Sequence, residues 1–368
     1  MLNRLGDYIV LNQEKNRDLE YGVSNVKGIS IKKIFIETKA NLRNVSLRPY
    51  LVVKPKYFAY VSVTSRNGEK VSIAFNETKN TYLVSSSYIS FSIKDINILL
   101  PEYLYIYFNR PEFDRIARFN SWGSARETFS WEDLCDLNIE IPSIKIQKKY
   151  VDVYNALTEN QKAYENGLDD LKLVCDSYIE NLKNSLPIQS IKKHIENSIE
   201  KNTDQIYSEA IGIGTEGFIP PKVESSKNTK NYNLVRYNYF IYNPSRINIG
   251  SIGLYKDTQI RICSPIYSVF RCLSKDLIPD YLFLWFKRED FKRYTSFKAV
   301  GSVRDNFPFI LMQEVEIPIP SFKVQKSIVN IYKVYETRKE INEKLKQQII
   351  EICPVLIKGA IQESKGVI

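Results

Sequence analysis

A glycine-rich stretch is the first part of this chain whose residue types and spacing would allow ligand binding. It reads Gly212-Ile213-Gly214-Thr215-Glu216-Gly217, the G-x-G-x-x-G spacing that cradles the phosphates of a dinucleotide when a helix follows directly. Phe218-Ile219-Pro220-Pro221 follows instead, and a pair of prolines does not readily begin such a helix. We therefore predict a turn without nucleotide binding.

Two further short patterns have simpler interpretations. Asn243-Pro244-Ser245-Arg246 is similar to the Asn-Pro-Pro-aromatic loop with which amino-methyltransferases hold the target amine, but the second proline and the aromatic residue are missing. We predict a turn between strands there. Glu37-Thr38-Lys39 and Glu77-Thr78-Lys79 each contain the Glu-x-Lys of a metal-dependent nuclease. Without an Asp placed beside them, they indicate no nuclease site.

Residues that bind metals are few and scattered. His194 is the only histidine, so a His-based metal site or proton relay cannot be built, and a surface position is expected. The five cysteines include no Cys-x-x-Cys pair, which argues against a zinc site and against a disulfide framework. We predict no metal, no cofactor and no catalytic residue in this chain, and we expect a reducing compartment.

The formal net charge of +10, from 52 Lys and Arg against 42 Asp and Glu, favours a polyanionic partner. Arginine suits guanine edges, asparagine suits adenine edges, and lysine more often holds phosphate. For each such residue, a solvated loop position is the alternative. The predicted contacts to double-stranded DNA are the loop cations and amides Arg43, Asn44, Arg48, Arg66, Asn67 and Lys70 in the first half, and Lys227, Asn228, Lys230, Asn231, Arg246 and Lys256 in the second.

The segments that must position these residues are short runs rich in β-branched and aromatic residues. Arg66-Asn67-Gly68 predicts a hairpin turn between two of them. A helix is expected next in each half, because a proline followed by an acid is a good helix start. Strands are predicted within residues 29–36, 50–53, 57–63, 71–75, 82–93, 234–242, 247–255 and 259–272, and helices over 101–115 and 279–293.

A long amphipathic helix is predicted after each of these globular parts. The first has Ser143 as N-cap, ends before Pro187, and spans roughly 60 Å at 1.5 Å per residue. The second begins at Ser321, has a less regular seam, and is expected to kink or end its regular part at Pro354. Neither helix can bury the apolar residues along one of its faces by itself, so we predict that the two helices pack together. The first seam contains Tyr150, Tyr154, Leu157, Gln161, Tyr164, Leu168, Leu171, Cys175, Tyr178 and Leu182, at heptad spacing.

The chain contains an internal repeat. A shift of 178 positions aligns 123–154 with 301–332, and 13 of these 32 positions are identical without a gap. A shift of 186 aligns Glu14-Lys15-Asn16 with Glu200-Lys201-Asn202. Duplication of this length predicts a duplicated fold and a two-fold function. The equivalent pairs Arg126 and Arg304, Gln147 and Gln325, and Tyr154 and Tyr332 are predicted to serve the repeat framework or a partner contact.

The order of these parts resembles the specificity subunits of Type I restriction-modification systems, and the resemblance covers essentially the whole chain. It rests on the alternation of globular part and long helix, and on Gly-Ser-x-Arg followed by Ile-Pro-Ser and Gln-Lys in the first half and by the equivalent residues of the second. It also rests on Leu5-Gly6-Asp7-Tyr8-Ile9, on Tyr242-Asn243-Pro244 and on Gly250-Ser251-Ile252-Gly253.

This resemblance implies that each globular part is a target recognition domain for one half of a split DNA sequence, and that the helices form a coiled coil that sets the gap. It implies a chain without catalytic activity. Methyltransferase subunits, expected as two, would bind the helical regions and carry S-adenosylmethionine. A separate restriction and translocase subunit would cut the DNA.

We therefore predict an α+β fold with two strand-rich target recognition domains, a pseudo-two-fold internal repeat and an antiparallel coiled coil. The recognition domains are assigned to 1–142 and 187–320, the central spacer helix to 143–186 and the C-terminal spacer helix to 321–368. No apolar run reaches the roughly 18 residues of a membrane span, and a cytoplasmic protein without membrane contact is expected. Two alternatives stay open: a self-contained DNA methyltransferase or nuclease, and a coiled-coil scaffold that binds proteins.

Overall fold

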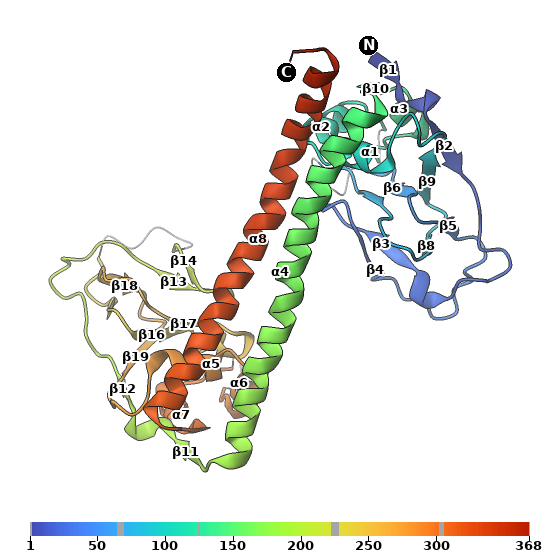
Figure 1. Cartoon of the computed structure of the whole chain (residues 1–368). Coiled ribbons are helices and arrows are strands. Elements are labelled where there is room, and N and C mark those ends of the chain that lie inside the picture. Colours follow the sequence, from blue (N-terminus) through green and yellow to red (C-terminus); the bar gives the residue numbers. More distant parts are fainter. Residues whose placement is uncertain (1, 65–69, 124–125, 222–227, 302–304, 368) are drawn as a thin grey trace. The chain divides into compact units, whose positions relative to one another are not determined.

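The computed structural model describes residues 2–64, 70–123, 126–221, 228–301 and 305–367 (Figure 1). The chain forms two compact units. Unit 1 contains residues 1–165 and 341–368, and unit 2 contains residues 166–340. Because both long helices pass from one unit to the other, these units cut across the four segments assigned from the sequence, and that division stays a prediction.

Unit 1 is built on a four-stranded antiparallel sheet. Its strand order is β2 (Ile9–Asn12), β9 (Tyr88–Ile93), β6 (Phe58–Val61) and β7 (Ile73–Phe75). Three two-stranded antiparallel sheets surround it: β5 (Leu51–Val53) with β8 (Tyr82–Val84), β3 (Lys27–Ile29) with β4 (Phe35–Glu37), and β1 (Leu2–Arg4) with β10 (Asn138–Glu140).

Unit 2 repeats this topology strand for strand. Its four-stranded sheet has the order β12 (Ile195–Asn197), β19 (Ser268–Cys272), β16 (Tyr239–Tyr242) and β17 (Ile252–Leu254). The two-stranded sheets are β15 (Asn233–Val235) with β18 (Arg261–Cys263), β13 (Gly212–Ile213) with β14 (Phe218–Ile219), and β11 (Ile188–Ser190) with β20 (Glu316–Pro318). The predicted internal repeat and the α+β class are confirmed.

The same aromatic stack forms the centre of each core. In unit 1 the rings of Phe58 and Phe91 are stacked at 4.9 Å, and Phe108 meets Phe58 edge-on at 5.7 Å. In unit 2 the rings of Phe240 and Phe270 are stacked at 4.7 Å, with an edge-on third phenylalanine again beside them. Stacked and edge-on rings are the favoured geometries of buried aromatic pairs, so the repeat extends to the packing of the cores.

Several predicted elements are broken by turns. The run 29–36 contains a tight turn in which Lys33 has φ 62°, and the run 82–93 contains a turn at 85–87. The helix predicted over 101–115 is two helices, because Pro111 begins a new one and has no N–H to continue the first. The short helices are α1 (Pro101–Phe108), α2 (Pro111–Phe119) and α3 (Trp131–Cys135) in unit 1, and α5 (Pro279–Phe286), α6 (Glu289–Lys298) and α7 (Phe309–Gln313) in unit 2, with single 3-10 turns at Leu5–Asp7, Val23–Asn25, Ile191–Lys193 and Ile247–Ile249.

The two long helices are α4 (Ile144–Ser185) and α8 (Phe322–Ser364). In unit 1 the start of α4 meets the end of α8, where Lys149 Nζ lies 2.8 Å from Glu363 Oε2. In unit 2 the end of α4 and the start of α8 share one core through Ile179 and Ile328. The helices therefore run antiparallel, as predicted (Figure 1).

The predicted heptad seam of α4 is largely confirmed. Tyr154, Gln161, Leu168, Cys175 and Leu182 are all buried, and they lie seven residues apart. The prediction that Tyr178 belongs to the seam is wrong, because this residue is 48% exposed. The next residue, Ile179, is buried instead.

Pro354 is predicted to kink α8 or to end its regular part. The predicted end is wrong, because the helix continues to Ser364. A proline inside a helix costs about 3 kcal/mol because one backbone hydrogen bond is lost. Cys353, Leu356 and Ile357 flank it and are buried in the core of unit 1. Burial of these side chains on one helical face offsets that cost. No helix of the described ranges is long and apolar enough to cross a bilayer.

A buried polar pair joins the two long helices inside unit 1. Gln161 Nε2 donates to Asn342 Oδ1 at 2.8 Å, and the two residues are 7% and 2% exposed. Polar residues at a coiled-coil seam specify register at some cost in stability. Asn342 thus accounts for one polar position in the less regular seam of the second helix.

Replacing Asn342 with leucine is expected to destabilise unit 1 by about 1–3 kcal/mol, because one buried N–H of the Gln161 amide loses its acceptor and only the bond to Glu165 Oε2 (3.1 Å) remains. The double variant Gln161→Leu/Asn342→Leu should recover most of this loss, since both polar groups are then gone. Denaturant unfolding of the two variants checks this. A double variant less stable than the single one would contradict the assignment.

Candidate nucleic-acid interface

A buried asparagine fixes the chain at the same place in both units. In unit 1 Asn16 donates from Nδ2 to the carbonyl oxygen of Tyr21 (2.9 Å), and its Oδ1 accepts from the Tyr21 backbone N–H (3.1 Å). In unit 2 Asn202 makes the same two bonds with Tyr207, at 2.8 and 3.2 Å. Both asparagines are 3% exposed, so each is a structural anchor and not a contact residue.

This anchor also holds the end of a long loop. The Asn16 N–H donates to the carbonyl oxygen of Tyr50, and the Asn202 N–H donates to that of Tyr232, each at 3.0 Å. We call residues 38–50 and 220–232 the first reader loops. Most of the predicted contact residues lie on them, and those within the described ranges are exposed: Arg43, Asn44 and Arg48 in unit 1, and Asn228, Lys230 and Asn231 in unit 2.

A second pair of loops follows the central strands β6 and β16. We call residues 62–72 and 243–251 the second reader loops; they bear the exposed cations Lys70 and Arg246. The predicted turn at Asn243 is confirmed, since its Oδ1 accepts from the Ser245 N–H (3.0 Å) and its carbonyl oxygen from the Arg246 N–H (3.0 Å). Most of the predicted contact residues therefore lie on loops that occupy equivalent places in the topology of the two halves.

Each second reader loop is held by the segment that ends the Gly-Ser-x-Arg repeat. In unit 1 the Phe129 N–H donates to the carbonyl oxygen of Ser62 at 2.8 Å. In unit 2 the Phe307 N–H donates to the carbonyl oxygen of Pro244 at 2.9 Å. The best-repeated part of the sequence thus supports a loop whose own residues differ between the halves.

Other predicted residues have different surroundings. Lys256 contacts Asp280 Oδ2 at 2.6 Å and Asn238 Oδ1 at 2.7 Å, so it links a turn to the start of α5. Arg66, Asn67, Lys227 and Arg304 lie outside the described residues. Gly212–Ile213 form β13, and a turn joins them to the antiparallel strand β14, so the predicted turn is confirmed.

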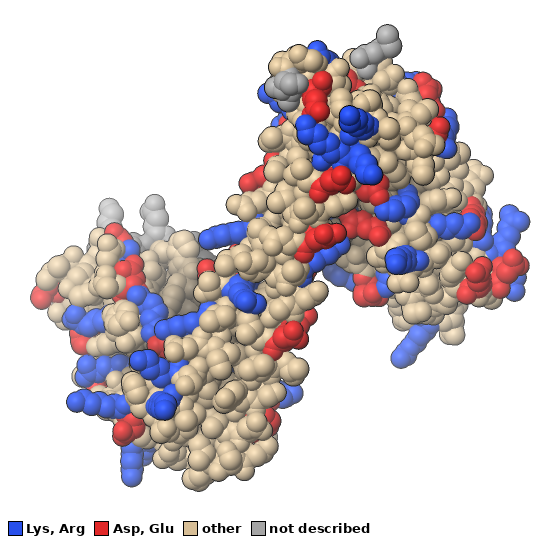
Figure 2. Space-filling view, in the orientation of Figure 1, with Lys and Arg blue, Asp and Glu red and all other residues tan. Residues whose placement is uncertain are grey.

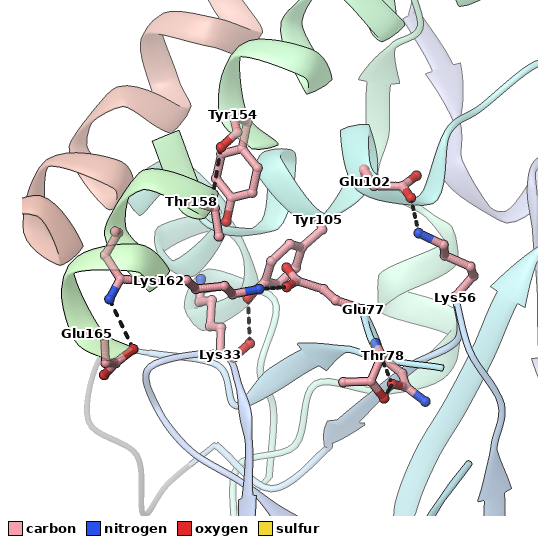
Figure 3. Close-up of polar contacts among 12 residues, drawn as sticks. Lys33, Lys56, Glu77, Thr78, Glu102, Tyr105, Tyr154, Thr158, Lys162 and Glu165 are labelled. Atoms are coloured by element: carbon pink, nitrogen blue, oxygen red, sulfur yellow. Dashed lines mark hydrogen bonds and ion pairs between the residues drawn. The ribbon is translucent and has the colours of Figure 1, made fainter. Parts of the chain in front are cut away.

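The Glu-x-Lys pattern at Glu77 belongs to a set of contacts within unit 1 (Figure 3). Glu77 Oε2 lies 3.4 Å from the Nζ of Lys162 on α4. Thr78 donates from its hydroxyl to Asn76 Oδ1 at 2.8 Å. The Glu77–Lys162 contact connects the β7–β8 turn to the long helix α4.

The equivalent glutamines are part of the framework. Gln147 is fully buried: its Oε1 accepts from the Leu100 N–H (2.9 Å), and its Nε2 donates to the carbonyl oxygens of Ile98 and Pro142 (both 2.8 Å). Gln325 in unit 2 is also fully buried. It makes the same three bonds with the equivalent residues Ile278, Asp276 and Pro320 (2.9, 2.6 and 2.8 Å). Full burial leaves no surface for a partner at these residues.

The other predicted repeat pairs are less alike. Tyr154 is buried and meets the ring of Tyr105 edge-on at 6.3 Å. Tyr332 is half-buried, and its hydroxyl oxygen lies 3.1 Å from Lys287 Nζ. Arg126 is exposed. A role in partner contact for Arg126 and Tyr332 stays a prediction.

The charged side chains of the described residues suit the binding of DNA phosphates. Lys and Arg side chains are distributed over the visible face of the strand-rich part of each unit, with Asp and Glu among them (Figure 2). The reader loops offer guanidinium, ammonium and amide groups, which donate to phosphate and to base edges.

Two buried cysteines are not suited to nucleophilic chemistry. Burial raises the pKa of the Cys263 and Cys353 thiols to about 12, so both are protonated at neutral pH and are poor nucleophiles.

Sequence reasoning missed the role of the asparagine anchor and of a buried ion pair. The shift of 186 positions aligns Asn16 with Asn202, and this repeat was the signal in the sequence that could have indicated the anchor. Lys33 and Asp114 form the ion pair, with 2.8 Å between Nζ and Oδ1. No local pattern connects residues so far apart in the sequence.

A duplicated α+β scaffold with exposed, basic reader loops defines a two-part nucleic-acid-binding protein. The chain matches the family described as Type I restriction modification DNA specificity domain over residues 24–171 and 187–351. It belongs to this family, and it is a DNA target-recognition subunit. No curated protein matches the sequence.

One solved structure shares the fold at low sequence identity, and two further ones are matched with lower TM-scores. The chain is similar to the S subunit of a Type I restriction-modification system from M. genitalium, with 10% identity, a TM-score of 0.59, and coverage of 98% of this chain and 95% of that one. It also matches the HsdS subunit from Thermoanaerobacter tengcongensis, with 13% identity, a TM-score of 0.42, and coverage of 99% and 97%. A chain from a study of complex assembly in the Type I system matches with 12% identity, a TM-score of 0.48, and coverage of 97% of both chains.

Proposed function

We propose that this chain reads a DNA target in two separated halves, one with each unit, and positions methyltransferase and restriction subunits on it. The observation that carries the proposal is the pair of reader loops in each unit. Their framework is the same, down to the hydrogen bonds of Asn16 and Asn202, while the exposed residues that they present differ. A shared scaffold with different contact residues suits two readers of different half-sites.

The chain itself is proposed to be non-catalytic. S-adenosylmethionine is expected in the partner methyltransferase, and two such partners would match the two-fold repeat. DNA binding by the chain alone is expected to be weak and to become tighter when the methyltransferase is present, because the partner adds its own contacts to the duplex.

Exchange of residues 20–100 for those of another member of the family is expected to change only one half of the methylated target. Both reader loops of unit 1 lie within this segment, whereas Asn16, Gln147 and the whole of unit 2 lie outside it. Sequencing of methylated adenine in cells that carry the exchanged chain checks this result. A change in both halves, or in neither, would contradict the proposal.

Two rival functions have direct tests. A self-contained methyltransferase would transfer methyl groups to DNA as a purified chain without partners. A scaffold that binds only proteins would have no salt-dependent affinity for DNA, with or without partners, whereas phosphate contacts weaken steeply with salt.

A further inference from the structure

The most exposed apolar side chain among the described large hydrophobic residues is Phe297, at 86%. It lies near the C-terminal end of α6 in unit 2. The shift of 178 positions aligns it with Phe119, the last residue of α2 in unit 1, which is 77% exposed. Exposure of one large apolar residue needs no explanation, but exposure of the same residue at equivalent positions of both units indicates a use.

The surroundings of both phenylalanines are basic. Residues 115–126 contain three arginines and no acid, and the equivalent residues 293–304 contain Arg293, Lys298 and Arg304 and no acid. Arg115 and Arg293 are 74% and 77% exposed, and each pairs with an acid three residues earlier on its own helix. Exposed pairs of this kind contribute little, so these guanidinium groups remain able to bind phosphate.

Backbone pairing connects this surface to the second reader loop. Trp122, which is 66% exposed, exchanges hydrogen bonds of 3.1 and 2.9 Å with Thr128, and Thr128 forms a bridge with Val63. In unit 2 Val300 and Asn306 exchange the same two bonds, both at 2.9 Å, immediately before the contact of Phe307 with Pro244. The exposed phenylalanines therefore belong to the segment that holds each second reader loop.

We propose that Arg115, Phe119 and Trp122 in unit 1, and Arg293, Phe297 and Lys298 in unit 2, form a duplicated DNA contact that does not depend on sequence. The cations hold phosphates, and the phenyl rings pack against sugars and base edges in a groove of the duplex. This inference rests on the proposed function. It extends that function by giving each unit a non-specific DNA contact next to the loops that read the sequence.

Charge decides between DNA and a protein partner for this surface. A methyltransferase subunit bound twice would also explain the duplication. Apolar centres of protein interfaces, however, are depleted in charge, whereas Arg115 and Arg293 place an exposed guanidinium group on the same helix as each phenylalanine, which suits a phosphate backbone. The arginine and the phenylalanine also stay the same in both halves, as Arg115 and Arg293 and as Phe119 and Phe297, while the reader loops differ, as a contact that is independent of sequence requires.

The test measures the affinity of the full-length chain for two labelled duplexes of unrelated sequence, between about 50 and 200 mM salt. Phe119→Ala and Phe297→Ala are each expected to lower the affinity about fivefold to tenfold on both duplexes, with an unchanged slope of affinity against salt. Arg115→Gln and Arg293→Gln should each reduce that slope by about 1. Phe322→Ala removes a phenylalanine that is 56% exposed at the start of α8, and it should change neither quantity.

Three outcomes would overturn the inference. If both phenylalanine variants keep an intact fold by circular dichroism and an unchanged affinity for DNA, the proposed DNA contact is ruled out. If the same variants keep their DNA affinity but no longer copurify with the methyltransferase subunit of the host system, the surface binds protein. If the unmodified chain has no salt-dependent DNA affinity, alone or with that subunit, the proposed function fails and this inference fails with it.

Discussion

Replacement of Asp114 with alanine is expected to destabilise unit 1 by about 3–5 kcal/mol, because it leaves a buried lysine without its counter-charge. The Lys33 and Asp114 side chains are 5% and 13% exposed, with 2.8 Å between Nζ and Oδ1. Lys33 also donates to the carbonyl oxygen of Phe108 at 2.5 Å. Lys33 therefore ties the β3–β4 hairpin, which leads into the first reader loop, to α2 through Asp114 and to the end of α1 through Phe108.

The pH dependence of this variant has a definite sign. Burial lowers the pKa of Lys33, and the nearby Asp114 carboxylate opposes that effect. Without the carboxylate the pKa falls further, so the folded variant binds fewer protons than the unfolded chain between this lowered value and the ordinary lysine value. Stability of Asp114→Ala should therefore rise with pH over that window, and its loss relative to the unmodified chain should be largest at lower pH.

Denaturant unfolding at neutral and alkaline pH measures both effects. Asp7→Ala is the control, because Asp7 and its partner Arg4 are 65% and 52% exposed at 3.7 Å, and such a pair contributes little. The double variant Lys33→Met/Asp114→Asn should be more stable than Asp114→Ala. A loss for Asp114→Ala as small as that of Asp7→Ala would contradict the assignment.

Replacement of Gln147 with alanine is expected to cost about 3 kcal/mol, and Gln325→Ala should cost the same in unit 2. Each glutamine makes three hydrogen bonds at full burial. Removal of the amide leaves the Leu100 or Ile278 N–H and two carbonyl groups without that partner, and an unsatisfied buried group costs about 1–3 kcal/mol. The first turn of each long helix would then separate from the segment before α1 or α5.

Native-state hydrogen exchange can locate these two effects, since a chain with two units need not unfold in one step. Gln147→Ala should raise exchange around residues 98–100 and at the start of α4, and Gln325→Ala around residues 276–278 and at the start of α8. Gln189→Ala, at an exposed position of β11, is the control. Equal effects of both variants on both units would show that the glutamines do not act locally.

The structure also shows where sequence reasoning was limited. The turn at Lys33 lay inside a run of residues that favours strands, because β-propensity does not reveal a single residue with positive φ. Pro354 was expected to disturb α8, yet the helix continues to Ser364 because tertiary burial outweighs the local penalty. Tyr178 matched the heptad spacing, but the packed surface of α4 selects Ile179 instead.

The sequence by itself determined the duplication, the α+β class, the two long helices and the family. These follow from signals that extend over a few residues, such as apolar spacing and turn residues, and from the identity of 123–154 with 301–332 at 13 positions. Only the tertiary structure decided that the exposed cations of each half gather on equivalent loops, that Gln147 and Gln325 are buried in the framework, and that Lys33 meets Asp114. The physical reason is that burial and partner choice depend on segments distant in the chain, which local spacing does not encode.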